Sequence, residues 1–301
     1  MTPDTPLRVG YIAIVGRPNV GKSTLLNRIL GQKVSITSPK PQTTRHRILG
    51  IKTTDEAQFI YVDTPGLHRK AKKAINRYMN RAAGGALADV DVVLMVIEAL
   101  RWTDEDQMVL ERVRQASAPV ILVVNKVDKV KEKKALLPFL QEMAERHDFH
   151  EVFPLSAVRG DNVIELQRTI QELLPEGHPY FPEDQITDRS ERFLVAEVVR
   201  EKLMLATRDE LPYAVTVEVE RFREEKGILH IDAVIWVERQ SQKSIVIGHG
   251  GARLKRVGID ARKELETMFG SKVMLKLWVK VKEGWSDNER ILRTFGYTEE
   301  S

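Results

Sequence analysis

The chain has 301 residues, a formal net charge of +4 and 42% hydrophobic residues. This composition is typical of a folded protein, and at about 150 residues per domain the length predicts two domains. It contains no cysteine, and this excludes disulfide frameworks, Cys-ligated metal sites and catalysis by a thiol. No basic segment precedes the first apolar stretch, and no uncharged stretch approaches the about 18 residues of a membrane span. We therefore expect a cytosolic protein.

Short apolar runs alternate with helix-length segments through the first 175 residues. Strands are predicted at Val9–Val15, Ile48–Lys52, Ala57–Val62, Val92–Ile97, Val120–Val124 and Val152–Leu155. Of these, the strand at Ile48–Lys52 is expected to pair antiparallel with the next one. Helices are predicted at Lys22–Leu30, Ile75–Ala86, Asp104–Gln115, Glu132–Arg146 and Asn162–Leu173. This alternation predicts an α/β domain with a mostly parallel, doubly wound sheet.

The pattern changes after Pro175–Ser190, a stretch with several prolines and acidic residues and no apolar period, which predicts an interdomain linker. An amphipathic helix is predicted over Glu191–Thr207, followed by two alternating strands. A glycine-rich turn at Gly248–Gly251 is expected to open a pair of basic helices, and a last strand follows over Val273–Val281. The predicted organisation is an α/β domain at 1–175, a linker at 176–190 and an α+β domain at 191–301.

The segment Gly16–Ser23 has the pattern G-x-x-x-x-G-K-S between the first predicted strand and an apolar helix. The backbone N–H groups of such a loop and the positive end of the following helix bind phosphates. Lys22 is expected to reach the β- and γ-phosphate oxygens, and the Ser23 hydroxyl is expected to ligate Mg²⁺. The predicted nucleotide-binding residues here are Gly16, Asn19, Val20, Gly21, Lys22, Ser23 and Thr24.

Two further motifs follow predicted strands. In D-T-P-G, Asp63 is placed to hold Mg²⁺ and the Gly66 N–H to sense the γ-phosphate. In N-K-V-D, the Asp128 carboxylate can accept hydrogen bonds from N1–H and the exocyclic amine of guanine, two donors that adenine lacks on that edge. The sequence therefore predicts GTP and GDP as ligands, with a base site made of Asn125, Lys126, Asp128, Ser156 and Ala157.

These motifs, in this order, resemble GTPases of the translation-factor class, and the segments Gln42–Arg47 and Leu67–His68 are similar to the Era family in particular. The resemblance implies that Thr44, or Thr43 as the alternative, supplies the threonine that closes on Mg²⁺. The residues implied in hydrolysis are Lys22, Thr44 and Gly66, and the implied metal ligands are Ser23, Thr44 and Asp63.

Two positions bear on the rate of hydrolysis. Leu67 occupies the place where many small GTPases have a water-orienting Gln, so we expect slow intrinsic hydrolysis that depends on positioning and charge stabilisation. Asn19 resembles the asparagine with which related GTPases bind K⁺. A loop-capping role for Asn19 is the alternative, and the sequence leaves both open.

The segment Val246–Leu254 has the I-G-x-x-G form of a KH domain, in which a glycine loop clamps the backbone of about four single-stranded nucleotides. The surrounding stretch Arg239–Ile259 holds basic residues and no acidic one. The order of predicted elements is that of the type II KH arrangement. The predicted RNA contacts are Lys243, Ile247, Gly248, His249, Gly250, Gly251, Arg253 and Lys255.

Over nearly the whole chain, the resemblance to the Era family implies binding near the 3′ end of small-subunit ribosomal RNA, action in 30S assembly and peripheral association with the inner membrane. We expect a monomer. A metabolic GTPase is one alternative, but the sequence shows no second catalytic constellation. A purely RNA-binding protein would not need Thr44, Asp63 and Gly66. A membrane-remodelling GTPase would need a lipid-inserting helix, and Glu191, Glu197 and Glu201 argue against one.

Overall fold

The computed structural model describes residues 7–40, 42–66, 73–85, 87, 89–207 and 215–297. These residues form two compact units. The first comprises described residues within 1–35, 44–70 and 79–188, and the second comprises those within 36–43, 71–78 and 189–301. The second unit therefore combines the C-terminal part of the chain with two short segments of the N-terminal part.

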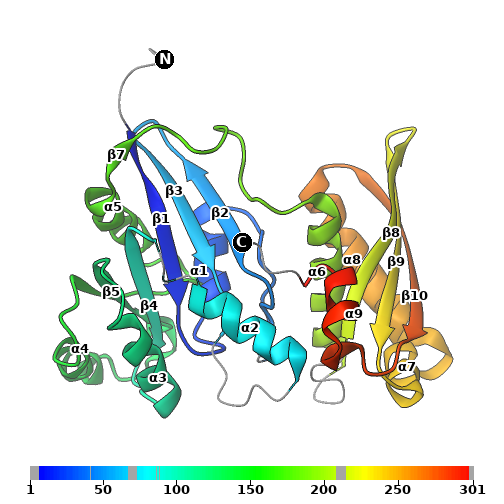
Figure 1. Ribbon diagram of the computed structural model, residues 1–301, viewed down its shortest axis with the longest axis horizontal. Helices are drawn as coiled ribbons and strands as arrows, with labels where there is room; N and C mark the ends of the chain where they lie inside the picture. Colours follow the sequence, from blue (N-terminus) through cyan, green and yellow to red (C-terminus); the bar gives the residue numbers. More distant parts are fainter. Residues whose placement is uncertain are drawn as a thin grey trace. The chain divides into compact units, whose positions relative to one another are not determined.

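The first unit is built on a seven-stranded sheet in the order β2-β3-β1-β4-β5-β6, with β7 paired to β1 (Figure 1). The strands are β1 (Leu7–Val15), β2 (Ile48–Thr53), β3 (Ala57–Asp63), β4 (Val92–Glu98), β5 (Val120–Asn125), β6 (Glu151–Pro154) and β7 (Glu176–Gly177). β2 runs antiparallel to β3 and β7 antiparallel to β1, whereas the other pairs are parallel. The predicted α/β class and the antiparallel β2 are confirmed.

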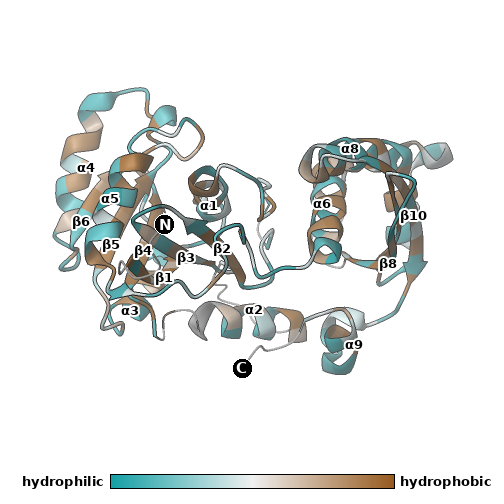
Figure 2. Ribbon diagram, turned by 90° about the horizontal axis from the view of Figure 1, so that it is seen from above, coloured by the Kyte–Doolittle hydropathy of each residue, from teal (hydrophilic) through white to brown (hydrophobic). Residues whose placement is uncertain are grey.

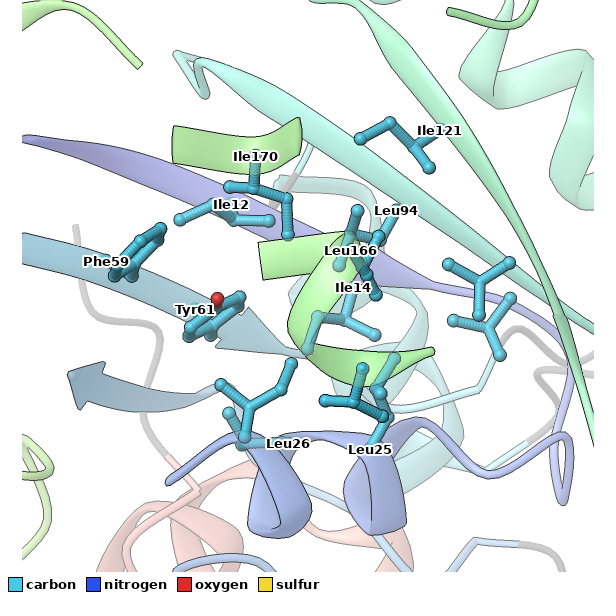
Figure 3. Packing of buried hydrophobic residues seen from close by; sticks show 14 of the residues in the cluster. Ile12, Ile14, Leu25, Leu26, Phe59, Tyr61, Leu94, Ile121, Leu166 and Ile170 are labelled. Atoms are coloured by element: carbon cyan, nitrogen blue, oxygen red, sulfur yellow. The ribbon is translucent and has the colours of Figure 1, made fainter. Parts of the chain in front are cut away.

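Helices cover both faces of this sheet because successive side chains of a strand point to opposite sides. Ile12 and Ile14 of β1 pack in one cluster with α1 and α5, while Ala13 and Val15 pack in another with α3 and α4. Figure 3 shows the first cluster, in which Leu25 and Leu26 meet the inward residues of the strands. The helices of these clusters are α1 (Lys22–Leu30), α3 (Asp104–Val113), α4 (Leu136–Ala144) and α5 (Val163–Leu173). Helix α2 (Ala74–Gly85) belongs to the second unit up to Tyr78 and to the first unit from Met79. Ligands of such sheets lie beyond the carboxyl ends of the strands.

The helix expected at Glu132–Arg146 is shorter than predicted. A 3₁₀ turn occupies Lys133–Ala135, and the α-helix runs from Leu136 to Ala144. Pro138 lacks an N–H and is tolerated only in the first turn of a helix, so its position favours an α-helical start just before it.

The stretch predicted as a linker lies along the first unit for most of its length. Its residues Glu176–Gly177 form β7, and the Ile186 carbonyl accepts a hydrogen bond from the Ile51 N–H at 2.9 Å. The buried Gln58 side chain accepts the N–H groups of Tyr180 and Phe181 at 2.8 and 3.0 Å. Backbone pairing therefore holds a segment that composition alone describes as irregular.

The second unit contains a three-stranded sheet in the order β10-β9-β8, in which β9 is antiparallel to β8 and parallel to β10. Its elements are α6 (Glu191–Ala206), β8 (Val215–Glu225), β9 (Ile228–Val237), α7 (Gln240–Ile247), α8 (Ala252–Phe269), β10 (Lys272–Val281) and α9 (Glu289–Thr294). The apolar sides of α6 and α8 cover one face of the sheet (Figure 2). The predicted KH fold is confirmed.

Two features of this unit differ from the prediction. The glycine turn does not open the helical pair but joins its two helices, because Gly248 ends α7 and Gly251 begins α8. The polar run Gln240–Ser244 carries too weak an apolar period to reveal α7. Helix α9 was not predicted; it is short, and the Asn288 side chain caps it by accepting the Arg290 and Ile291 N–H groups.

Candidate functional site

The glycine-rich loop between β1 and α1 closes on its own lysine. The buried Lys22 ammonium donates to the carbonyl oxygens of Gly16 and Arg17 at 2.9 and 3.0 Å. Burial lowers the pKa of Lys22 to about 8, against the opposing charge of Asp63. Gly21 allows the close approach of Asn125 at the end of β5, since a Cβ on Gly21 would lie 2.2 Å from Asn125 Nδ2. The loop is thus preformed around a buried cationic group.

Four oxygen-bearing side chains meet near the start of α1. Ser23 Oγ donates to Asp63 Oδ2 at 2.7 Å and lies 2.8 Å from Thr44 Oγ1. Ser35 Oγ also donates to Asp63 Oδ2, at 2.9 Å. Burial raises the pKa of Asp63, although the Lys22 charge and the serine hydroxyls act against it.

This oxygen cluster fits a small, hard cation. Asp63 is fully buried, and its Oδ1 is a buried acceptor with no hydrogen-bond partner in the described structure. Carboxylate and hydroxyl oxygens are the ligand types that Mg²⁺ prefers. Of the two threonines left open by the sequence, Thr44 joins the cluster, whereas Thr43 Oγ1 bonds to Ser38 Oγ and the Lys40 carbonyl.

The D-T-P-G segment lies against the glycine-rich loop. Thr64 Oγ1 donates to the Ile14 carbonyl at 3.0 Å. A Cβ on Gly66 would lie 2.8 Å from Pro18 Cγ, so only glycine permits this approach. Leu67 and His68, which carry part of the family resemblance, lie outside the described residues.

The N-K-V-D loop is held by its asparagine. Asn125 Nδ2 donates to the Val20 carbonyl at 2.8 Å, and Asn125 Oδ1 accepts the N–H groups of Lys126 and Ala157 at 2.7 and 3.0 Å. One side chain therefore joins three loops: the glycine-rich loop Gly16–Ser23 (the phosphate loop), the N-K-V-D loop Asn125–Asp128 (the base loop) and the loop after β6.

The residues expected around the base come together, with one difference. Ser156 Oγ donates to Asp128 Oδ1 at 2.7 Å, which orients that carboxylate. The expectation of a backbone N–H at Ser156 or Ala157 directed at guanine O6 meets competition inside the chain. The Ser156 N–H donates to the Asp161 carbonyl at 3.3 Å, and the Ala157 N–H donates to Asn125.

Asn19 is exposed and adopts a left-handed backbone conformation with φ of 65°. Asparagine tolerates this region better than most residues. The loop therefore has a conformational reason for Asn19 that is independent of any cation.

Arg17, Glu98 and Asp106 are residues of this site that the sequence did not reveal. Arg17 belongs to the motif only as a variable position, although its guanidinium is buried and lies 3.0 Å from Asp106 Oδ2. A helix-capping pattern, Thr103 followed three residues later by Asp106, was the available signal for that carboxylate.

The Gly248–Gly251 loop borders a groove between α8 and β10 of about 420 Å³. The groove has an apolar floor with basic residues beside it, and its lining residues are Gly251, Leu254, Lys255, Gly258, Ile259, Arg262, Leu275 and Leu277. The composition suits nucleotide bases against the floor and phosphates near the cations and the glycine loop.

Of the predicted RNA contacts, the structure brings Gly251 and Lys255 into the groove lining. Ile247 packs against the core instead, and Arg253 Nη1 donates to the Ile245 carbonyl at 2.6 Å, which braces the end of α7. Lys243 is half-buried, and His249 and Gly250 are exposed at the loop. Arg262 is a lining residue that the sequence did not indicate, because it lies beyond the acid-free stretch.

Family models match both units of the chain. A model described as a 50S ribosome-binding GTPase matches residues 11–126, and a KH-domain model matches residues 210–286. The curated relatives include the GTPase Era of Pseudomonas aeruginosa (strain LESB58), 61% identical over 96% of this chain and 95% of its own length. GTPase Era of Ectopseudomonas mendocina (strain ymp) is 60% identical over 98% of this chain and 99% of its own.

Two solved structures match with a TM-score of 0.93 and 44% sequence identity over 97% of this chain. One is a variant of Aquifex aeolicus Era bound to GDP and AlF₄⁻, of which the match covers 100%. The other is Era in complex with MgGDPNP and nucleotides 1506–1542 of 16S ribosomal RNA, of which it covers 99%. Both resemble the whole of this chain rather than one of its domains.

Proposed function

Since this chain belongs to the Era family of GTPases, we propose that it is a GTP-hydrolysing switch that binds the single-stranded 3′ end of small-subunit ribosomal RNA and acts in 30S assembly. The observation that carries the proposal is that one chain brings together the residues expected around a guanine nucleotide and also has a groove beside a glycine loop. The relative that binds 16S ribosomal RNA together with MgGDPNP supports the same combination.

Hydrolysis by this site depends on positioning and charge. Lys22 and the backbone N–H groups of its loop surround the β- and γ-phosphates, and the Gly66 N–H meets the γ-phosphate. Ser23, Thr44 and Asp63 would hold Mg²⁺, which supplies positive charge where the phosphoryl oxygens gain negative charge. Asp128, oriented by Ser156, selects guanine. Slow intrinsic turnover is expected because Leu67 stands where many small GTPases have a water-orienting Gln.

Within the second unit, the KH domain contacts the chain next to the two segments expected to respond to GTP, which are those around Thr44 and Gly66. Arg200 of α6 donates to the Thr43 carbonyl, and Glu201 Oε1 accepts the Thr37 N–H at 2.8 Å. Asp287 Oδ1 accepts the Ala74 N–H at the start of α2, at 2.9 Å. These hydrogen bonds hold the chain at Thr37 and Thr43, before Thr44, and at Ala74, eight residues after Gly66. A nucleotide that reorders either segment therefore changes the contacts of the RNA-binding domain.

This coupling predicts that RNA affinity depends on the nucleotide. Binding of a fluorescent single-stranded RNA with the small-subunit 3′-end sequence is measured by anisotropy at one salt concentration. With a non-hydrolysable GTP analogue the affinity should exceed that with GDP by about 5–150-fold, the usual range of allosteric coupling. Equal affinities would mean that the switch governs another partner. No binding in either state would overturn the assigned RNA function.

We further propose that Asn19 helps to hold K⁺ near the phosphates, where the added charge would assist hydrolysis. The GTPase rate in K⁺ should then exceed that in Na⁺ at matched ionic strength by about tenfold, a modest effect for one charge-stabilising group. Asn19→Ala should remove the difference. Identical wild-type rates in the two salts would leave Asn19 with the loop-capping role alone.

Peripheral association with the inner membrane and a monomeric state complete the proposal, and the family resemblance supports them. In the part of the chain that the structure describes, no helix has both the length and the apolar character needed to cross a membrane. Helix α6 does not suit lipid insertion either, because Glu197, Arg200 and Glu201 are buried within the second unit. These buried charges disfavour the membrane-remodelling alternative.

A further inference from the structure

Glu98, the last residue of β4, lies between the two loops that define the nucleotide site. Its Oε2 is 3.1 Å from Arg17 Nη2 in the phosphate loop and 3.1 Å from Lys126 Nζ in the base loop. A third cation, Arg101 Nη1, lies 4.0 Å from the same oxygen. One carboxylate oxygen thus joins three segments of the first unit.

The Arg17 side of this arrangement is fixed. The Arg17 residue is 5% exposed, and its Nε donates to Asp106 Oδ2 at 3.0 Å. Asp106 is itself held by the Thr103 N–H and hydroxyl, at 2.9 and 2.7 Å. The Arg17 carbonyl accepts from Lys22 Nζ at 3.0 Å. Because the Arg17 carbonyl contacts Lys22 directly, a displacement of Arg17 would also disturb the phosphate-binding lysine.

The backbone after β4 supports the position of Glu98. The Ala99 N–H donates to the Asn125 carbonyl at 2.8 Å, and Glu98 and Arg101 form an isolated bridge. Leu100, inside this turn, has φ of 58°. A left-handed conformation costs a leucine about 1–2 kcal/mol, and strain of this kind persists where the surrounding structure imposes it. Although burial opposes ionisation, Lys126 and Arg17 hold the pKa of Glu98 below its usual value.

We propose that Glu98 is a positioning residue for nucleotide binding, whose carboxylate sets the spacing of the phosphate loop and the base loop through Arg17 and Lys126. A guanine nucleotide that spans both loops then meets a site already arranged for it, which lowers the cost of binding. Glu98 does not touch the reacting atoms. Its loss therefore affects nucleotide binding more than the chemical step of bound GTP.

The test compares Glu98→Gln with Glu111→Gln, a matched loss of charge at a surface ion pair between Glu111 of α3 and Arg114, which follows the helix. Affinity for a fluorescent GDP is measured by stopped flow, and hydrolysis of bound GTP by single turnover. Glu98→Gln should raise the Kd for GDP about tenfold, within the range of networked charges, mainly through faster dissociation, with a smaller fold-change in the single-turnover rate of bound GTP. Glu111→Gln should change neither quantity. Glu98→Asp, which keeps the charge, should recover part of the affinity.

Several outcomes would overturn this role. They are a Kd within about twofold of wild type for Glu98→Gln, an equal loss in Glu111→Gln, no recovery in Glu98→Asp, or a slower chemical step at unchanged affinity. A thermal-melting curve for each variant restricts the comparison to folded protein. The inference rests on the nucleotide site of the proposed function and not on RNA. A failure of the nucleotide assignment itself would appear separately, as absence of GDP binding by the wild-type protein.

Discussion

Asp128→Asn should convert a guanine site into a xanthine site. The carboxylate offers two acceptors to the two donors of guanine, whereas an asparagine amide presents one acceptor and one donor group. The amide donor would oppose the guanine exocyclic amine and suit the C2 oxygen of xanthine. A site left with unpaired polar groups rejects a ligand strongly, so GTP affinity should fall by about 10²–10³-fold while affinity for xanthosine triphosphate rises.

Ser156→Ala is the matched control for this exchange. It removes the hydroxyl that donates to Asp128 Oδ1 at 2.7 Å but leaves the carboxylate in place. We expect a loss of GTP affinity of about tenfold or less, as for one hydrogen bond of ordinary strength, because the carboxylate that contacts guanine remains, with no gain for the xanthine nucleotide. Competition of unlabelled GTP, ATP and xanthosine triphosphate against fluorescent GDP gives all three affinities. Equal wild-type affinity for ATP and GTP would contradict the assignment of Asp128.

The parts of the fold and the site that were predictable are those encoded in short segments. The helix Lys22–Leu30 was predicted with its observed bounds, because an apolar period follows a glycine and no strand-forming run competes with it. The phosphate loop and base loop were predicted for a related reason. Backbone N–H groups and a paired-acceptor carboxylate impose fixed residue types at fixed spacing.

The parts that were not predictable depend on residues far apart in the chain. Glu98 and Lys126 are 28 positions apart, and nothing in either neighbourhood indicates their ion pair. The hydrogen bond from Arg200 to the Thr43 carbonyl joins residues 157 positions apart. From the sequence, the acidic residues of α6 were interpreted only as unfavourable for lipid insertion, whereas Glu197 and Glu201 are buried partners of basic and backbone groups. Burial of paired charges depends on tertiary neighbours, which local periodicity does not encode.

Gly250→Asp should weaken RNA binding strongly while nucleotide binding stays normal. Gly250 has φ of 55°, and a Cβ there would meet no atom within 4 Å, so the side chain fits. Aspartate also tolerates this backbone region better than most residues. The new carboxylate would stand beside the groove where phosphates must approach the main chain. Repulsion and lost phosphate contacts should lower RNA affinity on the order of 100-fold.

Two variants separate the charge from its side effects. Gly250→Asn has nearly the same shape and the same tolerance of positive φ without the charge, so it should retain most of the RNA affinity. Gly270→Asp introduces the same carboxylate at a glycine with φ of 62° and open space, at the opposite end of the 18-residue helix α8, about 27 Å away at the helical rise per residue. It should bind RNA almost as well as wild type at physiological salt, because that distance exceeds the Debye length about threefold. If Gly250→Asp kept wild-type affinity, or if Gly270→Asp lost as much, the glycine loop would not be the phosphate clamp, and RNA would have to bind by overall charge alone.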